Sequence, residues 1–382
     1  MKNLTKSLTA FLAAAVMTVS ASGISAFATP APEPQAGWEK RNDGWAYYDS
    51  NKYEFVSGKN FAVEGILYSF DENGICIKEY SGLIKENGVK RRYNKGIPYT
   101  GWTKNKNDNS RKYYLDGYPV TGDFPIEGKV YSFDKNGIYT GENTVPVLVA
   151  DCGEKISSDT DKFRITVTAH DEKGNSYAAG EPVRMERWEK GKWVDCIGAD
   201  VEYSQNESMA VINGIEGECF PNYDVVSFEP QKYTGNRFKE GYYRLVFTYW
   251  KSSGDGKMEL SDKEFYAVFR VVPPVEVSMS EEIYKIADSR NIDVWAYIDI
   301  NSEKLDTPEI ISSITWVVFI MEDGYWEDFI PETSYEEGCD SVDSNGTISL
   351  DLSGCFEAGC YEVAVSFNSL KHTYYRKMFR VE

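Results

Sequence analysis

Residues 67–75 read LYSFDENGI, and residues 130–138 read VYSFDKNGI. A related copy, KYYLDGYPVTG, lies between them at 112–122, and weaker copies lie at 45–58 and 92–101. Five glycines close the copies with spacings of 24, 19, 21 and 19 residues, at Gly58, Gly82, Gly101, Gly122 and Gly141. A fixed period near twenty residues is typical of an array of small stacked units.

Each copy has the composition of a β-hairpin. Aromatic residues such as Tyr131 and Phe133 favour a strand, and the Asp-Lys-Asn-Gly sequence at 134–137 favours a tight turn after it. One hairpin is marginally stable in water, so an array gains its stability from contacts between neighbouring units. We therefore predict a solenoid of about five two-stranded hairpins over residues 37–142.

Residues 143–382 contain longer segments with strand-like alternation, such as FRITVT at 163–168 and EFYAVFRV at 264–271. Pro273 and Pro274 mark a boundary, because a double proline cannot continue a central strand. Beyond it, MEDGYWED at 321–328 echoes WEKGKWVD at 188–195, and the ending FRV recurs at 269–271 and 379–381. These patterns predict an all-β chain with two tandem β-sandwich domains, 143–272 and 273–382, each with about seven short strands.

The first 28 residues have the features of a signal peptide. Lys2 and Lys6 precede an apolar run over 8–19, and Ala-Phe-Ala at 26–28 resembles a cleavage site. The run is too short to span a bilayer, and no later stretch is apolar enough to cross one. Residues 29–36 contain three prolines and predict an extended linker. We expect a secreted protein that associates non-covalently with the cell wall or surface.

The charge of the chain argues against a nucleic-acid partner. The net charge is −19, with 60 acidic and 41 basic residues. A protein that binds nucleic acid normally carries a basic patch, and here the basic cluster is limited to Lys90, Arg91 and Arg92 inside a repeat.

Seven cysteines are present, and export permits disulfides between them. No Cys-x-x-C pair occurs, which disfavours a zinc ribbon or a thioredoxin-like site. The candidate bridges are Cys196 with Cys219, and Cys339 with either Cys355 or Cys360. Buried unpaired thiols are the alternative.

The N-terminal copies resemble the cell-wall-binding repeat family, which includes choline-binding and glucan-binding repeats. The family pattern pairs a Gly-Trp with a strand that reads Trp-Tyr-Tyr-Phe-Asp and ends in a glycine turn. Gly-Trp occurs here at 37–38 and 101–102, and the strand tryptophan is retained at Trp45. The resemblance implies attachment to a choline-bearing teichoic acid or to a glucan-like polysaccharide.

In choline-binding members, three aromatic rings surround a quaternary ammonium by cation–π attraction. The resemblance places such a box at Trp38 and Trp45, with Tyr68 or Phe70 as the third wall. A second candidate combines Trp102 with Tyr113 and Tyr114. Lys90 and Lys112 occupy the strand-tryptophan position in other copies and would repel choline. Stacking on sugar rings, and a purely structural role of the aromatics, are the alternatives.

The C-terminal part resembles bacterial immunoglobulin-like domains, through the Gly-Tyr-Tyr-Arg strand at 241–244 and the FRV endings. Such domains commonly serve as spacers or adhesive modules. Our first hypothesis is a non-catalytic surface-binding protein whose repeats attach it to wall polymer or another glycan, with the sandwiches projecting outward. A second hypothesis is an adhesin or receptor whose sandwiches bind a protein partner, with the repeats only as an anchor.

Catalytic motifs are scarce. The two histidines, His170 and His372, do not form a metal-binding pair, and no nucleophile elbow or phosphate-binding glycine loop is present. The sequence therefore predicts a non-catalytic protein without cofactor or metal. A glycan-active enzyme that uses an unrecognised pair of carboxylates is a third hypothesis.

Overall fold

The computed structural model describes residues 35–86, 88–144, 146–169, 176–179, 182–196, 210–213, 224–228, 238–252, 257–286, 294–335, 341–343, 346–352, 354–367 and 373–382. These residues are almost entirely in β-strands and include one short helix, α3 (Pro308–Ile311). The prediction of an all-β chain is confirmed. Residues 35–382 belong to one contiguous unit of contacts.

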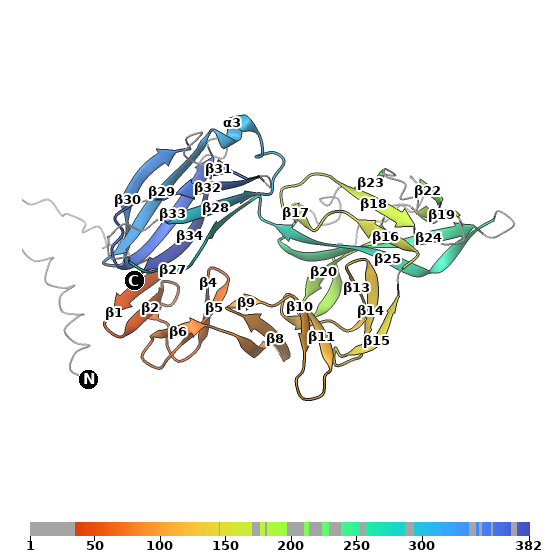
Figure 1. Ribbon diagram of the computed structural model, residues 1–382, viewed down its shortest axis with the longest axis horizontal. Helices are drawn as coiled ribbons and strands as arrows, with labels where there is room; N and C mark the ends of the chain where they lie inside the picture. Colours follow the sequence, from red (N-terminus) through yellow and green to blue (C-terminus); the bar gives the residue numbers. More distant parts are fainter. Residues whose placement is uncertain are drawn as a thin grey trace, which may run out of the picture. The chain divides into compact units, whose positions relative to one another are not determined.

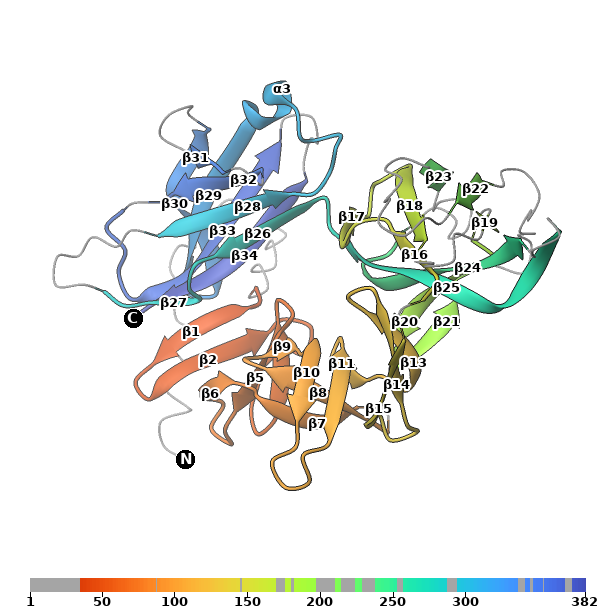
Figure 2. The ribbon, with the colours of Figure 1, turned by 45° about the vertical axis from the view of Figure 1, so that its right-hand side comes forward.

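The aromatic repeats form five consecutive three-stranded antiparallel sheets, which we call units 1 to 5. Figures 1 and 2 show them following one another along the red-to-yellow part of the chain. Their strands are β1 (Gly37–Arg41), β2 (Gly44–Asp49), β3 (Glu54–Phe55), β4 (Asn60–Val63), β5 (Ile66–Phe70), β6 (Cys76–Glu79), β7 (Gly82–Glu86), β8 (Val89–Asn94), β9 (Ile97–Pro98), β10 (Gly101–Lys104), β11 (Arg111–Leu115), β12 (Tyr118–Pro119), β13 (Gly122–Ile126), β14 (Lys129–Phe133) and β15 (Tyr139–Thr144). Each unit thus has one strand more than the predicted hairpin.

The turn after the aromatic strand has the geometry that its sequence predicts. The Asp134 carboxylate accepts hydrogen bonds from the backbone N–H groups of Asn136, at 2.9 Å, and Ile138, at 2.7 Å. Asp71 makes the equivalent bonds in unit 2, to Asn73 and Ile75. Gly137 has a φ of 74°, which side chains rarely adopt. The repeated Asp-x-Asn-Gly sequence therefore determines a local turn.

Backbone contacts join neighbouring units. Gly96, in the β8–β9 turn of unit 3, accepts a 2.9 Å bond from the Leu67 N–H of unit 2. One unit later, Gly117 accepts a 2.7 Å bond from the Arg92 N–H. A Cβ at Gly96 would lie 2.4 Å from Ile66, and one at Gly117 would lie 2.7 Å from the Arg92 carbonyl. Glycine is needed here because the next unit approaches so closely.

Residues 148–272 form two sheets with a core between them, which we call sandwich 1. The smaller sheet has the order β16-β18-β23, and the larger contains β17-β25-β24-β19-β22 together with the hairpin β20–β21. The strands are β16 (Leu148–Asp151), β17 (Lys155–Ser157), β18 (Phe163–Ala169), β19 (Ser176–Ala179), β20 (Arg184–Glu189), β21 (Lys192–Asp195), β22 (Ala210–Asn213), β23 (Asp224–Phe228), β24 (Gly241–Ser252) and β25 (Met258–Val272). Leu148 and Ile165 of the small sheet share a buried cluster with Leu245 and Phe269 of the large sheet.

Residues 275–381 form a second pair of sheets, sandwich 2, with orders β26-β28-β32-β31 and β27-β34-β33-β29-β30. The strands are β26 (Val275–Met279), β27 (Ile283–Tyr284), β28 (Trp295–Ile300), β29 (Ile314–Glu322), β30 (Tyr325–Ser334), β31 (Ser341–Val342), β32 (Thr347–Asp351), β33 (Gly359–Phe367) and β34 (Tyr374–Val381). Both sandwiches pair a short early strand in parallel with the last strand, β17 with β25 and β27 with β34. This shared pairing agrees with the echo in the sequence.

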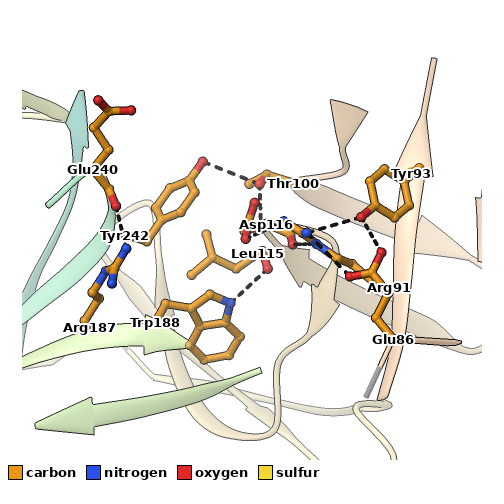
Figure 3. A network of polar contacts seen from close by, with 10 residues as sticks. All are labelled: Glu86, Arg91, Tyr93, Thr100, Leu115, Asp116, Arg187, Trp188, Glu240 and Tyr242. Carbon is orange, nitrogen blue, oxygen red and sulfur yellow. Dashed lines mark hydrogen bonds and ion pairs between the residues drawn. The ribbon is translucent and has the colours of Figure 1, made fainter. Parts of the chain in front are cut away.

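The repeats contact both sandwiches. Phe124 of unit 5 stacks on Trp193 of the β20–β21 hairpin, with ring centroids 6.0 Å apart. The indole N–H of Trp188 in that hairpin donates a 3.0 Å bond to the Leu115 carbonyl of unit 4, as Figure 3 shows. Unit 1 packs against sandwich 2 through the cluster that contains Trp38 and Cys360.

The two sandwiches also contact each other. Lys155 forms an ion pair with Asp299 at 3.2 Å, and Lys304 forms one with Asp161 at 3.0 Å. The Ser302 hydroxyl donates a 2.8 Å bond to Asp159. Together with the two contacts of the repeats, these bonds complete a closed ring of contacts among the repeats, sandwich 1 and sandwich 2.

Gly137→Ala and Gly128→Ala form a matched pair that measures the contact between units. Both glycines have a positive φ, 74° and 73°. A Cβ at Gly137 would lie 3.0 Å from the Val120 carbonyl of unit 4, whereas nothing lies within 4 Å of one at Gly128. We expect Gly128→Ala to lower the free energy of unfolding by about 1–2 kcal/mol, and Gly137→Ala by roughly 1 kcal/mol more. Equal losses in urea unfolding would contradict the close approach.

Candidate functional site

The structure brings together all four residues of the first predicted site. Trp38 lies on β1, Trp45 on β2, and Tyr68 and Phe70 on β5 of the next unit. The ring of Trp38 meets Tyr68 edge-on at a centroid distance of 4.9 Å and stacks on Phe70 at 5.8 Å. All four side chains are only 4% exposed. We call this group the first aromatic box.

The first aromatic box already holds a cation of the chain. The Arg380 guanidinium of β34 lies 4.1 Å from the centroid of Trp38, 5.6 Å from that of Trp45 and 5.5 Å from that of Tyr68. Arg380 is itself 3% exposed. The box therefore binds a guanidinium of sandwich 2 in the arrangement that the resemblance implies for an external ammonium.

Polar contacts surround the box. The Trp45 indole N–H donates a 2.6 Å bond to the Glu382 carboxylate, and the Tyr68 hydroxyl donates to Glu282. Glu64, at the β4–β5 turn, accepts a 3.1 Å bond from the Met378 N–H and lies 3.6 Å from the Lys377 ammonium. Burial raises the pKa of Glu64 above its usual value, and the nearby Lys377 only partly opposes this.

The second aromatic cluster has a different composition from the predicted one. Trp102 of β10 contacts Tyr113 across the strand pair at 5.4 Å, and it contacts Tyr131 at 5.3 Å and Tyr139 at 5.6 Å in unit 5. These four side chains are half-buried. The exposed Arg111 places its guanidinium 4.4 Å from the centroid of Trp102 and 5.7 Å from that of Tyr139.

Tyr114 is predicted beside Trp102, but its ring packs elsewhere. Successive residues of a strand point to opposite faces, so Tyr113 and Tyr114 cannot both face Trp102. Tyr114 is buried next to Tyr99, at a centroid distance of 6.3 Å, and lies near the Arg92 guanidinium. Tyr131 belongs to the repeated Tyr-Ser-Phe strand, so the repeat itself could have revealed it as a residue of the adjoining unit.

Arginines contact aromatic rings at the middle units as well. Arg91 lies 5.4 Å from the centroid of Tyr93 and 5.1 Å from that of Tyr118 in unit 4, and it forms a 2.8 Å ion pair with Asp116 (Figure 3). Arg92 lies 5.7 Å from the centroids of Tyr99 and Tyr114. The basic cluster of the sequence thus joins unit 3 to unit 4.

The cysteine positions correct the predicted bridges in part. Cys196 and Cys360 are free thiols in the structure, so neither forms the bridge proposed for it, while Cys219 and Cys339 lie outside the described residues. Cys360 is buried in the cluster around Trp38, and burial raises the pKa of its thiol to about 12. Cys355 remains a candidate partner for Cys339.

The described residues contain no group of three or more His, Cys, Asp and Glu side chains arranged to hold a metal ion. They also contain no helix with the length and apolar character of a membrane span. His170 and His372 lie outside the described residues.

No family model matches the chain. A glucosyltransferase-S from Streptococcus downei is 30% identical over 116 residues, which is 29% of this chain and 8% of the length of that enzyme. Among solved structures, the modular Cpl-1 endolysin complexed with a peptidoglycan analogue is 22% identical over 35% of this chain and 36% of its own, with a TM-score of 0.20. Choline binding protein F from Streptococcus pneumoniae is 22% identical over 28% of this chain and 35% of its own, also with a TM-score of 0.20. The chain thus spans a small fraction of the glucosyltransferase and about a third of each of the two solved structures.

The raised pKa of Glu64 predicts a pH effect on stability. Because the folded-state pKa lies above that of the unfolded chain, folding favours protonated Glu64, and this contribution is lost as the pH rises through the folded-state pKa. Relative to Glu64→Gln, which mimics the protonated form, the wild type should therefore gain thermal stability as the pH falls from about 7.5 toward the unfolded pKa near 4.3. Thermal unfolding of both proteins over this range measures the difference, in which the other carboxylates cancel. If the difference in thermal stability between the wild type and Glu64→Gln stays constant or reverses over this pH range, the raised pKa of Glu64 is contradicted.

Proposed function

We propose that the protein is a secreted, non-catalytic cell-surface protein whose repeats bind a cell-wall polymer or glycan through the second aromatic cluster. This proposal rests on the difference in solvent exposure between the rings of the two aromatic sites. The rings of the first aromatic box are buried around Arg380, whereas Trp102, Tyr131 and Tyr139 are half-buried and accessible. The similarity to a glucosyltransferase supports a carbohydrate ligand.

The surroundings of Trp102 favour a sugar over a quaternary ammonium. Arg111 lies over the rings of Trp102 and Tyr139, and a resident cation repels a second one. Lys112, between Arg111 and Tyr113 on β11, donates a 2.5 Å bond to the Asn136 carbonyl. A guanidinium also carries five N–H donors that can bond sugar hydroxyls while a ring stacks on the aromatic surface. We therefore propose a glucan-like polysaccharide, and a choline-bearing teichoic acid is the alternative that the experiments below include.

Trp102→Ala should weaken retention of the full-length secreted protein on isolated cell walls or immobilised glucan by about tenfold, because stacking and cation–π contacts of this kind contribute roughly 1–2 kcal/mol. Tyr374→Ala is the matched control, since it removes an aromatic ring that is 45% exposed on sandwich 2. Equal retention of Trp102→Ala and the control would reject the second aromatic cluster as the binding site.

Arg111→Ala distinguishes the two ligand classes. If the ligand is a glucan, loss of the guanidinium should reduce retention on immobilised dextran by tenfold or more, because hydrogen bonds to a charged group contribute about 1.5–3 kcal/mol. If the ligand is choline, the same change should increase retention on a choline resin, because it removes a competing cation from the ring face. Stronger choline binding without loss of glucan binding would overturn the preference for a sugar.

A further inference from the structure

The guanidinium in the first aromatic box comes from a distant part of the chain, unlike the other arginines that contact aromatic rings in the repeats. Arg91, Arg92 and Arg111 lie within the repeat units whose rings they contact or in the neighbouring unit. Arg380 belongs instead to β34, the last strand of sandwich 2. The box therefore makes a contact between two parts of the protein that the sequence separates by most of its length.

The backbone fits closely around this contact. A Cβ at Gly37 would lie 2.4 Å from the terminal methyl of Met321 on β29, and the Gln35 N–H donates a 3.0 Å bond to the Gly324 carbonyl. The Met378 N–H of β34 donates to the Glu64 carboxylate of unit 2. Units 1 and 2 therefore contact sandwich 2 through backbone groups as well as side chains.

Three aromatic ring faces lie within 6 Å of the buried guanidinium. A buried cation is costly unless it is compensated, and desolvated cation–π contacts are the stronger ones. A small pocket beside the box, lined by Trp38, Glu64, Tyr68, Glu282 and Lys377 among others, lies at the same contact.

We infer that the first aromatic box is an intramolecular receptor for Arg380, which holds sandwich 2 on unit 1 and closes the ring of contacts among the three parts of the protein. In this role the box accepts an external organic cation of guanidinium size only when the Arg380 side chain is absent. The inference does not depend on the second aromatic cluster, so it stands or falls separately from the proposed function.

Chemical rescue in the full-length protein tests this inference. Arg380→Ala should lower the thermal midpoint and raise amide exchange in β1 and β34 about tenfold, as expected from loss of a buried cation–π contact. Methylguanidinium at millimolar concentrations should restore the thermal midpoint and the slow amide exchange, with an effect that saturates. Urea, a neutral molecule of similar shape, and sodium chloride at the same ionic strength should restore neither. Arg111→Ala is the matched control, because it removes an arginine from an exposed aromatic cluster and should leave exchange in β1 and β34 unchanged.

The double variant Arg380→Ala/Trp38→Leu should show no rescue, because the ring face that binds the cation is gone. Unchanged exchange in Arg380→Ala, or equal effects of methylguanidinium on Arg380→Ala and Arg111→Ala, would overturn the inference. If Arg380→Ala does not fold, Arg380→Lys and Trp38→Phe provide a double-mutant cycle on thermal stability and exchange. Strictly additive effects in that cycle would overturn the inference equally, since a specific ring–cation contact requires coupling.

Discussion

Contacts between arginine guanidinium groups and aromatic rings hold the repeat array together and connect it to the rest of the chain. Arg91 and Arg92 contact rings of units 3 and 4, Arg111 covers Trp102, and Arg380 fills the first aromatic box. A ring face binds one cation at a time, so each of these contacts reduces the capacity of the array for an external ammonium. The cluster around Trp102 differs from the first aromatic box, because its rings are half-buried and its resident guanidinium is exposed.

The ring of contacts connects both sandwiches to the repeat array. Trp188 and Trp193 of sandwich 1 contact units 4 and 5, and Arg380 of sandwich 2 contacts unit 1. Ion pairs such as Lys155 with Asp299 link the two sandwiches. Exposed pairs of this kind contribute little by themselves, so the buried aromatic contacts at either end of the array carry most of the association.

Sequence reasoning identified part of each aromatic site. Trp38, Trp45, Tyr68 and Phe70 do meet, because the strand tryptophan and the Gly-Trp motif occupy positions set by a repeated local structure. Tyr114 was placed wrongly because the alternation of β11 directs it away from Trp102, and Tyr131 and Tyr139 were missed because they lie in the following unit. The predicted hairpin pairs the aromatic strand with the strand after the turn, as β14 pairs with β15, and it leaves out the strand before it, β13 in unit 5.

The sequence by itself determined the elements that depend on near neighbours. Alternation predicted the strands, and the Asp-x-Asn-Gly segments predicted turns that Asp71 and Asp134 indeed close through their own carboxylates. Only the tertiary structure decided what occupies the first aromatic box. Trp45 and Glu382, which are 337 residues apart, share a hydrogen bond beside Arg380. No local pattern encodes such a contact, because the cation and the rings belong to parts of the chain that fold around separate cores.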